Sequence, residues 1–547
     1  MSTIGTREYQ MYPIMDAAQT KTMRRFASGP QVRFAPGASV YAVGDDGAAA
    51  WLVLEGTLEI IRRDGLSHEA PVTVLGNGQF SGEVNQLAGR PSLAAGRAGP
   101  EGCTALPFDP SHLRALMIGS ADVGEIVMRA LILRRVALIE ESSAGTIVIG
   151  TSDNPDVLRL QGFLTRSGYP NMFLDAHLEN EGRDLVERIG ITPDELPLVV
   201  CPSGTLLKKP SDVQLATCLG ITPRLDPAKM YDVAIVGAGP AGLAAAVYAA
   251  SEGLSVIVLD GCAFGGQAGA SARIENYLGF PTGISGQALA GRAFNQALKF
   301  GAEIAIPVEV ERLNCEPGRL ALDIAGGHHI PARTIVVASG AAYRRPDISN
   351  LSTFDGAGIS YWASPIEARL CAGEDIALVG GGNSAGQAIA FLAPQVRKLH
   401  LFVRRPLSET MSQYLIDRIA SLPNVEIHEG TEVVGLEGQR SSGLETIIVE
   451  DRLTDKKLRY ALKHLFLFIG ADPNTDWLQG CLAIDDKGFV VTGLNGRPLE
   501  TSVPGIFAIG DVRANSTKRV AAAVGDGTSV VAQIHATLAQ MRQDTPT

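Results

Sequence analysis

Glycines recur in two short turns, at residues 237–242 and 380–385, at a spacing that allows a backbone to approach phosphate groups. In the first turn, Gly237 permits a tight bend, Gly239 allows a pyrophosphate to approach, and Gly242 allows close packing of helix on strand. A helix that begins at such a turn presents unpaired N–H groups and the positive end of its dipole to an anion. Both turns therefore predict nucleotide binding.

The residues that end the next strands differ between the two units. Asp260 ends the strand after the first turn, where a carboxylate accepts hydrogen bonds from ribose hydroxyls. The strand expected after the second turn, Lys398–Val403, ends in Arg404 and Arg405. Guanidinium groups pair with a 2′-phosphate, which a carboxylate would repel. The second unit therefore predicts a preference for NADPH over NADH, and a surface arginine pair without a ligand role is the alternative.

Residues 382–386 also match the G-x-S-x-G pattern of hydrolase nucleophiles, and Asp511 and His535 follow in the required order. The overlapping glycines and the sister turn at 237–242 favour a nucleotide site over that alternative. For the first turn, the alternative is a purely structural bend that binds no ligand.

In the last part of the chain, strands and helices are expected to alternate around these two turns. Apolar runs predict strands, and stretches of good helix formers predict helices. The expected elements are strands at Tyr231–Val236, Ser255–Leu259, Asp375–Val379 and Lys398–Val403, with helices at Leu243–Ser251 and up to Leu392. This alternation favours parallel-sheet, nucleotide-binding units.

The two earlier parts of the chain differ in the pattern of their expected strands and helices. The first has short glycine-separated runs, typical of a β-barrel or jelly roll, and then helices at Asp109–Leu116 and Ala121–Glu141. The second helix has an apolar stripe that Arg134 and Arg135 interrupt, so it packs either in a core or at a dimer or interdomain surface. In residues 145–220, strands and helices alternate, which indicates a small α/β domain. The expected strands of these two parts are Val32–Phe34, Val40–Val43, Ala49–Glu55, Thr57–Arg62, Val72–Val74, Thr146–Gly150, Asn171–Asp175 and Leu198–Cys201.

Composition excludes several classes of protein. Lys and Arg total 47 against 58 Asp and Glu, a net charge of −11, which argues against nucleic-acid binding. No apolar run approaches the roughly 18 residues of a membrane helix, and the N-terminus has no signal-peptide pattern. The seven cysteines show no C-x-x-C spacing and the nine histidines no ligand spacing, so we expect neither a disulfide scaffold nor a metal site. We therefore expect a reduced, cytoplasmic protein.

The last part of the chain resembles the low-molecular-weight thioredoxin reductases, which are FAD-dependent NADPH oxidoreductases. The similarity runs through VAIVGAGPAGLAAA (233–246), GGQAG (265–269), IENYLGFP (274–281), VVASG (336–340), VGGGNSAG (379–386), VRR (403–405), FIGADPNT (468–475) and GIFAIGDVR (505–513). It implies an FAD-binding domain at 229–343 and 466–547, with an NADPH-binding domain at 344–465 inserted between the two segments.

The resemblance also implies which residues contact each cofactor. Those for FAD are Gly237, Gly239, Pro240, Ala241, Gly242, Asp260, Gly265, Gln267, Asn276, Gly510, Asp511, Arg519, Val520 and Ala521. Those for NADPH are Gly382, Asn383, Ser384, Arg404 and Arg405. The protein positions and tunes the flavin, which accepts the hydride.

The reactive C-x-x-C of that family is missing from its usual place. It belongs just after the segment matched by residues 358–360, where this chain reads YWASPIE (361–367). Thiol–disulfide exchange needs a thiolate and a partner, so no dithiol relay is encoded there. Cys371 lies nearby without a partner and is expected to be a buried, structural group. Cys262, close to the first turn, is the one candidate redox thiol, and no catalytic residue is assigned.

Residues 20–142 resemble a cyclic-nucleotide-binding domain. The resemblance rests on FAPG (34–37) and on QFSGEV (79–84), which is similar to the family's phosphate cassette. Ser92 and Leu93 stand where the family has its phosphate-binding arginine, which leaves Arg90 or Arg97 as substitutes. The alternatives are a cyclic nucleotide, another small ligand, and a purely structural or dimerising role.

Residues 145–222 resemble thioredoxin in their alternation. Pro197 matches the proline-bearing strand of that family, and a cis peptide is expected before it. Where the redox pair belongs, the chain reads SDNP (152–155), with Asp153 or Asn154 as the helix cap. The module is therefore expected to be redox-silent.

Together these features predict a multidomain α/β protein: a jelly roll with helices, a thioredoxin-like module and two Rossmann-like domains. The predicted activity passes hydride from NADPH to FAD and then electrons to an acceptor, which is a small disulfide, a quinone, a redox protein or oxygen. The alternative is a redox-idle nucleotide-binding sensor with a reductase fold. By the same resemblance we expect a homodimer, and we expect no nucleic-acid or membrane partner.

Overall fold

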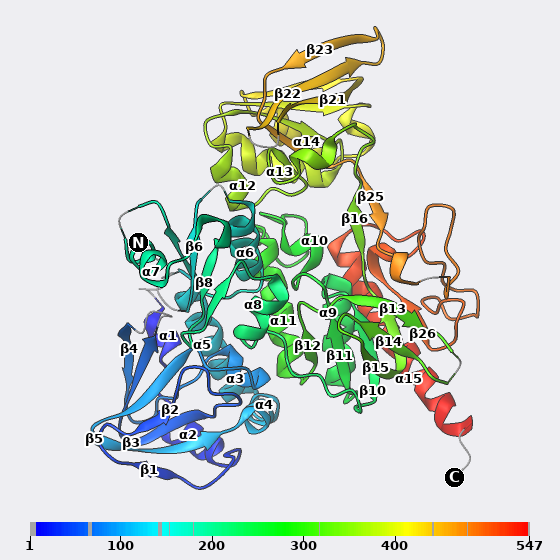
Figure 1. Ribbon diagram of the computed structural model, residues 1–547. Helices are drawn as coiled ribbons and strands as arrows, with labels where there is room; N and C mark the ends of the chain where they lie inside the picture. The colour runs from blue at the N-terminus through cyan, green and yellow to red at the C-terminus, as the bar shows by residue number, and fades with distance from the viewer. Residues whose placement is uncertain are drawn as a thin grey trace.

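The computed structural model describes residues 7–63, 68–140, 145–152, 154–178, 180–316, 318–439, 442–478 and 480–544. Figure 1 shows the N-terminal part in blue, a cyan unit next to it, a central green-to-red part that also contains the C-terminal helix, and a yellow upper lobe. The multidomain α/β class expected from the sequence is confirmed.

The N-terminal part is built on an antiparallel sheet. Its strands are β1 (Val32–Phe34), β2 (Ser39–Tyr41), β3 (Ala50–Arg63), β4 (Glu69–Leu75) and β5 (Ala94–Phe108). They pair in the order β1-β5-β3-β4, with β2 on β5. The strands expected at Ala49–Glu55 and Thr57–Arg62 form one strand, β3, which continues through Gly56 with a register shift. The sequence did not predict β5, whose Ala- and Gly-rich first half lacks the usual alternation of strands.

Helices cover one side of this sheet: α1 (Glu8–Met11), α2 (Ala17–Arg24), α3 (Val84–Ala88), α4 (Pro110–Gly119) and α5 (Ala121–Glu140). The stripe on α5 packs in the core, since Val123, Val127 and Leu131 are fully buried together with Leu52. Arg134 is itself buried, so it does not interrupt the buried face as the sequence suggested. Residue 141, the expected end of the helix, lies outside the described residues.

The small α/β unit expected to resemble thioredoxin has the strands β6 (Thr146–Gly150), β7 (Asn171–Asp175), β8 (Leu198–Val200) and β9 (Leu206–Lys208). Their order is β7-β6-β8-β9, with β6 and β7 parallel and the other pairs antiparallel. Its helices are α6 (Pro155–Arg166), α7 (Glu181–Ile189) and α8 (Asp212–Cys218), and α6 and α8 pack on the face opposite α7. Asn154 caps α6 through its side chain, whereas Asp153 lies outside the described residues. The Leu196–Pro197 peptide is cis, as expected.

The central part has a mainly parallel sheet in the order β12-β11-β10-β15-β14-β13, with β26 beside β15. The strands are β10 (Tyr231–Val236), β11 (Val256–Leu259), β12 (Glu303–Ala305), β13 (Val310–Asn314), β14 (Ala321–Ile324), β15 (His328–Val337) and β26 (Ile506–Ala508). The helices are α9 (Pro240–Ser251), α10 (Gly266–Gly269), α11 (Gly286–Lys299) and α15 (Val520–Asp544), and α9 packs between α11 and α15. The expected strand–turn–helix unit is confirmed here.

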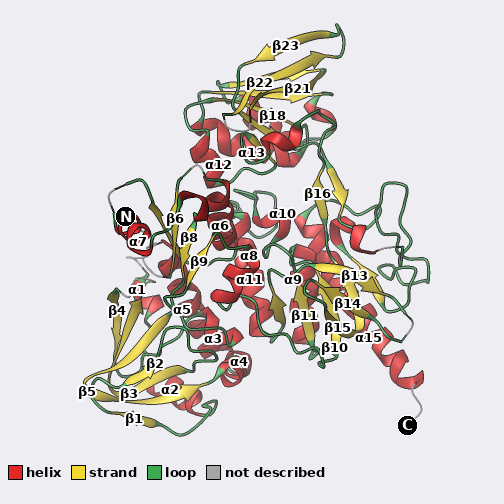
Figure 2. Ribbon diagram, in the orientation of Figure 1, coloured by secondary structure: helices red, strands yellow, loops and turns green. Residues whose placement is uncertain are grey.

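The upper lobe holds the second parallel sheet, ordered β17-β24-β18-β19-β20. Its strands are β17 (Ile359–Ser360), β18 (Asp375–Val379), β19 (Lys398–Val403), β20 (Val425–Glu429) and β24 (His464–Leu467). Helices α12 (Pro365–Leu370), α13 (Asn383–Leu392) and α14 (Gln413–Ala420) accompany it, and α13 and α14 pack on one face. The other face packs against an antiparallel sheet, visible at the top of Figure 2, of β21 (Thr431–Gln439), β22 (Gly443–Asp451) and β23 (Lys456–Tyr460). The strands β16 (Ala341–Tyr343) and β25 (Ala471–Pro473) pair where the chain enters and leaves this lobe.

The N-terminal and central parts share one hydrophobic cluster. Helices α3 and α4 contact α11, and buried Leu113 and Phe80 belong to the same cluster as Leu298 and Val233. The N-terminal part is therefore packed directly on the central part. Among the described residues, no helix has the length and apolar character needed to cross a membrane.

The expectation that all cysteines are reduced is wrong. Cys201 pairs with Cys218, and Cys315 pairs with Cys481, 166 residues away in the sequence. Spacing did not reveal these pairs, because the fold brings them together: Cys201 directly follows β8 and Cys218 ends α8. Cys103, Cys262 and Cys371 are free.

Candidate functional site

The first glycine turn joins β10 to α9, and close backbone contacts fix its shape. A Cβ at Gly237, where φ is +107°, would lie 2.2 Å from the carbonyl oxygen of Ala338. A Cβ at Gly242 would lie 1.9 Å from the carbonyl oxygen of Gly237. By contrast, a Cβ at Gly239 would meet only the Cα of Gly266, 4.0 Å away. The turn therefore requires glycine for packing at two positions and leaves room at the third, where a pyrophosphate would approach.

Asp260 follows β11 and lies against this turn. One carboxylate oxygen accepts the N–H of Ala238 at 2.8 Å, and the other accepts those of Cys262 at 2.8 Å and Ala263 at 3.1 Å. Burial raises the pKa of Asp260 in spite of these three bonds. In this structure the carboxylate holds the turn and the following loop in register, a role that the sequence did not predict.

The predicted flavin-side residues lie on the next loop. Gly265 has φ +94°, and a Cβ there would lie 2.5 Å from the Cβ of Ala290, so this position also requires glycine. The Gln267 side chain donates a hydrogen bond to the carbonyl oxygen of Ala341 at the start of β16. Asn276 is exposed.

The C-terminal segment returns to the first turn. A Cβ at Gly510 would lie 2.9 Å from the Cβ of Ala241, and one at Gly527 would lie 2.5 Å from its carbonyl oxygen. Burial raises the pKa of the neighbouring Asp511, while Lys518 opposes that shift. Residues 519–521, at the start of α15, are exposed or half-buried. The fold therefore brings 237–242 and 510–511 together as the resemblance implies.

The second glycine turn has the same plan between β18 and α13. A Cβ at Gly380 would lie 2.5 Å from the carbonyl oxygen of Phe468, whereas nothing lies within 4 Å of one at Gly382. The Asn383 side chain accepts the N–H of Ser412 at 2.7 Å. Ala385, in the third glycine position, is fully buried. The second turn therefore also leaves open space at its middle glycine.

The two arginines after β19 are exposed. Arg404 lies 4.0 Å from a carboxylate oxygen of Glu432, and Arg405 lies 3.7 Å from one of Glu409. Their side chains are 56% and 77% exposed, so both pairs are weak and solvent-screened. Neither guanidinium is committed to a buried partner, so a phosphate can compete for both.

A cleft lies between the central part and the upper lobe. Gln267 and Ser271 of the first unit line it together with Ser384 and Gln387 of the second. Its aromatic walls are Tyr343, Trp362 and Phe468. Burial raises the pKa of the Tyr343 hydroxyl, and the nearby Ser384 opposes that shift. Residues predicted for the two cofactors therefore meet at one opening.

The free cysteines are poor redox groups. Cys371 is fully buried, and burial raises the pKa of its thiol to about 11. Cys262 is exposed, but partial desolvation and the Asp260 carboxylate raise its thiol pKa. A thiol with a raised pKa has little thiolate at neutral pH, and no second free cysteine adjoins either residue in the sequence.

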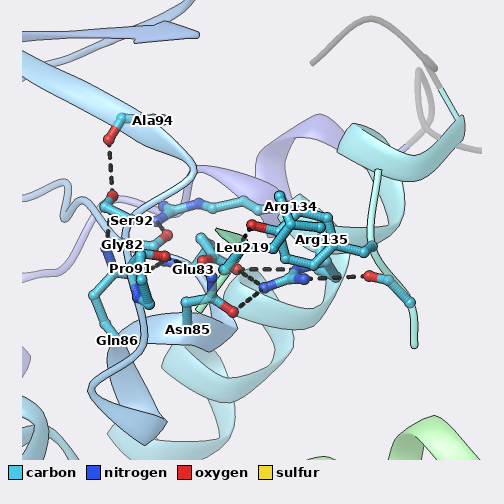
Figure 3. A network of polar contacts seen from close by, with 12 residues as sticks. Gly82, Glu83, Asn85, Gln86, Pro91, Ser92, Ala94, Arg134, Arg135 and Leu219 are labelled. Atoms are coloured by element: carbon cyan, nitrogen blue, oxygen red, sulfur yellow. Dashed lines mark hydrogen bonds and ion pairs between the residues drawn. The ribbon is translucent and has the colours of Figure 1, made fainter. Parts of the chain in front are cut away.

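The cassette of the N-terminal domain has its polar groups largely occupied (Figure 3). Arg135 of α5 donates to a Glu83 carboxylate oxygen at 2.5 Å and to Asn85 at 2.6 Å. It also donates to the carbonyl oxygen of Gly168, in the small α/β unit, at 3.2 Å. Arg134 donates to three backbone carbonyls, one of them Gly82 at 2.8 Å. Only the second Glu83 oxygen, among the described cassette side chains, is buried without a hydrogen-bond partner.

The arginines expected to replace the family's phosphate arginine are directed elsewhere. Arg90 donates to the carbonyl oxygen of Ile304 at 3.1 Å and lies over the ring of Phe294, both in the central part. Arg97 pairs with Glu69 at 3.4 Å on the exposed sheet. Ser92 is buried and donates to the carbonyl oxygen of Ala94 at 2.8 Å. Among its described residues, the cassette therefore offers an acceptor for a hydroxyl but no free cation for a phosphate.

Comparison with known proteins identifies two regions. Residues 231–527 match the family of pyridine nucleotide-disulphide oxidoreductases, and residues 31–119 match the cyclic nucleotide-binding domain. The chain is 33% identical over 302 residues to the thioredoxin reductase of Mycoplasmopsis pulmonis, which covers 55% of this chain and 95% of that one. It is also 33% identical over 301 residues to the NADPH-dependent thioredoxin reductase 3 of Arabidopsis thaliana. That match covers 54% of this chain but only 56% of the longer plant protein.

Solved structures give the same picture of the fold. The T. acidophilum thioredoxin reductase superposes with a TM-score of 0.52 at 28% identity, covering 56% of this chain and 98% of that one. The Lactococcus lactis thioredoxin reductase in its FR conformation reaches a TM-score of 0.54 at 24% identity, covering 57% and 99%. The chain therefore belongs to the pyridine nucleotide-disulphide oxidoreductases, as an FAD-dependent oxidoreductase of the thioredoxin-reductase type with an added cyclic-nucleotide-binding-like domain.

Proposed function

We propose that this chain is an NADPH-dependent flavoprotein reductase that delivers electrons to an acceptor other than a dithiol at the family's usual position. The observation that carries the proposal is the shared cleft, in which Gln267 of the FAD unit and Ser384 of the NADPH unit line one opening. Two cofactors bound at these units would present their reactive ends to the same space.

The roles of the individual residues follow from their surroundings. Gly239 and Gly382, with open space in front of them, leave room for the pyrophosphates of FAD and NADPH. Arg404 and Arg405 would pair with the 2′-phosphate of NADPH. The Gln267 side chain donates a hydrogen bond to the carbonyl oxygen of Ala341, where the chain enters the upper lobe. This bond would hold Gln267 in place at the edge of the cleft. FAD supplies the two-electron chemistry when it is bound, and the aromatic walls limit water in the cleft.

The acceptor must reach the reduced flavin through the cleft itself. Residues 361–367 contain no cysteine, and Cys371 is buried with a raised thiol pKa. We therefore propose a small disulfide, a quinone, a redox protein or oxygen as the acceptor class. A homodimer and a cytoplasmic location stay predictions, which light scattering and cell fractionation would check.

The proposal is tested by NADPH consumption by the flavin-loaded chain with each acceptor class in turn. We expect turnover of about 10 per second or more with at least one of them. A chain that binds FAD but is not reduced by NADPH would refute the enzyme and support the alternative, a redox-idle nucleotide-binding sensor.

For the N-terminal domain, we propose a bracing role between the other parts. The support is that Arg135 and Arg90, which could neutralise a phosphate, instead bond to Gly168 and to Ile304. The competing function is binding of a cyclic nucleotide, for which the unpartnered oxygen of Glu83 is the favourable observation. Calorimetry with cyclic AMP and cyclic GMP separates them: we expect no binding heat and no change in turnover, and a saturable heat would contradict the bracing role.

A further inference from the structure

A group of potential metal ligands lies on the second parallel sheet, apart from both glycine turns. Strands β19 and β20 pair in parallel with His400 opposite Glu426 and Phe402 opposite His428. Partners in a parallel pair point to the same face, and so do positions two residues apart on one strand. His400, Glu426 and His428 therefore share one face, towards β23, where the Tyr460 ring lies 5.2 Å from the His400 ring.

The three donor atoms have nearly the spacing of a metal site. Nδ1 of His400 lies 3.1 Å from Nε2 of His428, and it lies 3.6 Å from one oxygen of Glu426. The other Glu426 oxygen lies 3.9 Å from Nε2 of His428. A tetrahedral site with bonds of about 2.0–2.2 Å separates neighbouring ligand atoms by about 3.3–3.6 Å. One ligand atom from each residue lies within 4.8 Å of the others, so a side-chain adjustment of about an ångström would bring all three donors to a common centre.

The two rings are largely buried. The His400 side chain is 9% exposed and that of His428 is 17% exposed. In the contact between the two rings, one nitrogen donates a proton and the other accepts it. When a cation binds both nitrogens, the donor ring carries its proton on its other nitrogen instead, so each ring offers a lone pair to the ion. The Glu426 side chain is 47% exposed, which leaves an approach for the ion and for water.

One residue opposes the site. The Lys398 ammonium lies 2.5 Å from a Glu426 carboxylate oxygen, so it competes for the same ligand and repels a cation. The Lys398 side chain is 44% exposed, so solvent screens part of that repulsion. Removing its charge should therefore strengthen cation binding, an effect that is not expected of an unrelated surface site.

We propose that His400, Glu426 and His428 form a site for a divalent transition-metal ion of the zinc, nickel or copper class, with water completing the coordination. Two imidazoles and one carboxylate are a donor set for these ions and not for magnesium or calcium, which prefer all-oxygen sites. The ion would link β19 to β20. Its ligand His400 lies four residues before Arg404, in the strand that ends at the arginine pair. The site does not depend on the proposed reductase activity.

The test is calorimetry of zinc chloride with the flavin-loaded, tag-free full chain, in a Cys262→Ser background that removes the exposed thiol. We expect one zinc ion per chain. His428→Ala and Glu426→Gln should each weaken it by about tenfold or more, and Lys398→Met should strengthen it severalfold. The matched control is His329→Ala on β15, whose exposed ring pairs with Asp323 outside the cluster, and it should leave the affinity unchanged.

A second measurement guards against misfolded variants. Zinc should raise the melting temperature of the parent chain and of the His329→Ala chain, but not that of the His428→Ala chain, because an ion that binds only the folded state stabilises it. Each variant's melting curve without zinc reports its folding. Absence of binding in a folded parent chain overturns the proposal, as does zinc binding that His428→Ala and Glu426→Gln both leave intact.

Discussion

The molecule contains two kinds of motif that resemble phosphate-binding sites. They differ in whether space and polar groups remain free for a ligand. In the glycine turns of the central and upper parts, Gly239 and Gly382 face open space while their neighbours fix the bend. In the N-terminal cassette, Arg135 is bonded to Glu83, Asn85 and Gly168, and Arg90 is directed into another domain. We therefore propose that the two glycine turns bind nucleotides, and that the N-terminal cassette, whose nearby arginines are already paired, serves as a brace.

The largest effect is expected from closing the first turn. In Gly242→Ala, the new Cβ would lie 1.9 Å from the carbonyl oxygen of Gly237, so the turn must shift. We expect loss of FAD, measured as the flavin-to-protein ratio after purification. Gly291→Ala in α11 is the matched control, because nothing lies within 4 Å of its Cβ, and it should keep its flavin. Full flavin content in both variants would contradict the packing argument.

The second expected effect distinguishes the upper turn from the first. Replacing both Arg404 and Arg405 by alanine removes the charge-assisted contacts proposed for the 2′-phosphate, worth about 1.5–3 kcal/mol. The KM for NADPH should therefore rise by about 10- to 100-fold, while the KM for NADH changes little. Arg397→Ala, which removes an exposed arginine paired with Asp375, is the control. Equal losses for the two nucleotides would refute the assignment.

The third effect tests the brace. Arg135→Met leaves the buried Glu83 carboxylate without its cation, which costs about 3–5 kcal/mol for such pairs. We expect a lower melting temperature with an unchanged KM for NADPH. The double variant Arg135→Met with Glu83→Gln removes the uncompensated charge and should recover part of the loss. If the single and double variants melt together, the ion pair does not hold the cassette.

The smallest effect is expected at Cys262. Its thiol has a raised pKa and no neighbouring free cysteine, so Cys262→Ser should change the turnover with any acceptor by less than about twofold. Steady-state NADPH consumption measures this. A large loss with disulfide acceptors alone would instead assign Cys262 to the electron path.

The sequence predicts features that depend on neighbouring residues and not those that depend on long-range pairing. Strands β10, β18 and β19 have the expected bounds, since each is a buried apolar run beside a turn or loop. Strand β5 was not predicted, because its small residues carry no pattern and only pairing with β3 defines it.

The candidate site divides in the same way. The glycine turns and their order were predicted from local spacing, whereas the cleft between Gln267 and Ser384 depends on how the two units pack. The disulfide of Cys315 and Cys481 and the group of His400 with His428 join residues that are distant in the sequence. Spacing rules compare residues that are close in the sequence, so they predicted neither the disulfide nor the histidine group.

The central claim is that NADPH and FAD react across the cleft, and anaerobic titration of the flavin-loaded chain with NADPH tests it most directly. We predict that about one equivalent of NADPH bleaches the flavin absorbance, since a flavin takes up one hydride, and that NADH does so more weakly. A flavin that stays oxidised in excess NADPH would contradict it.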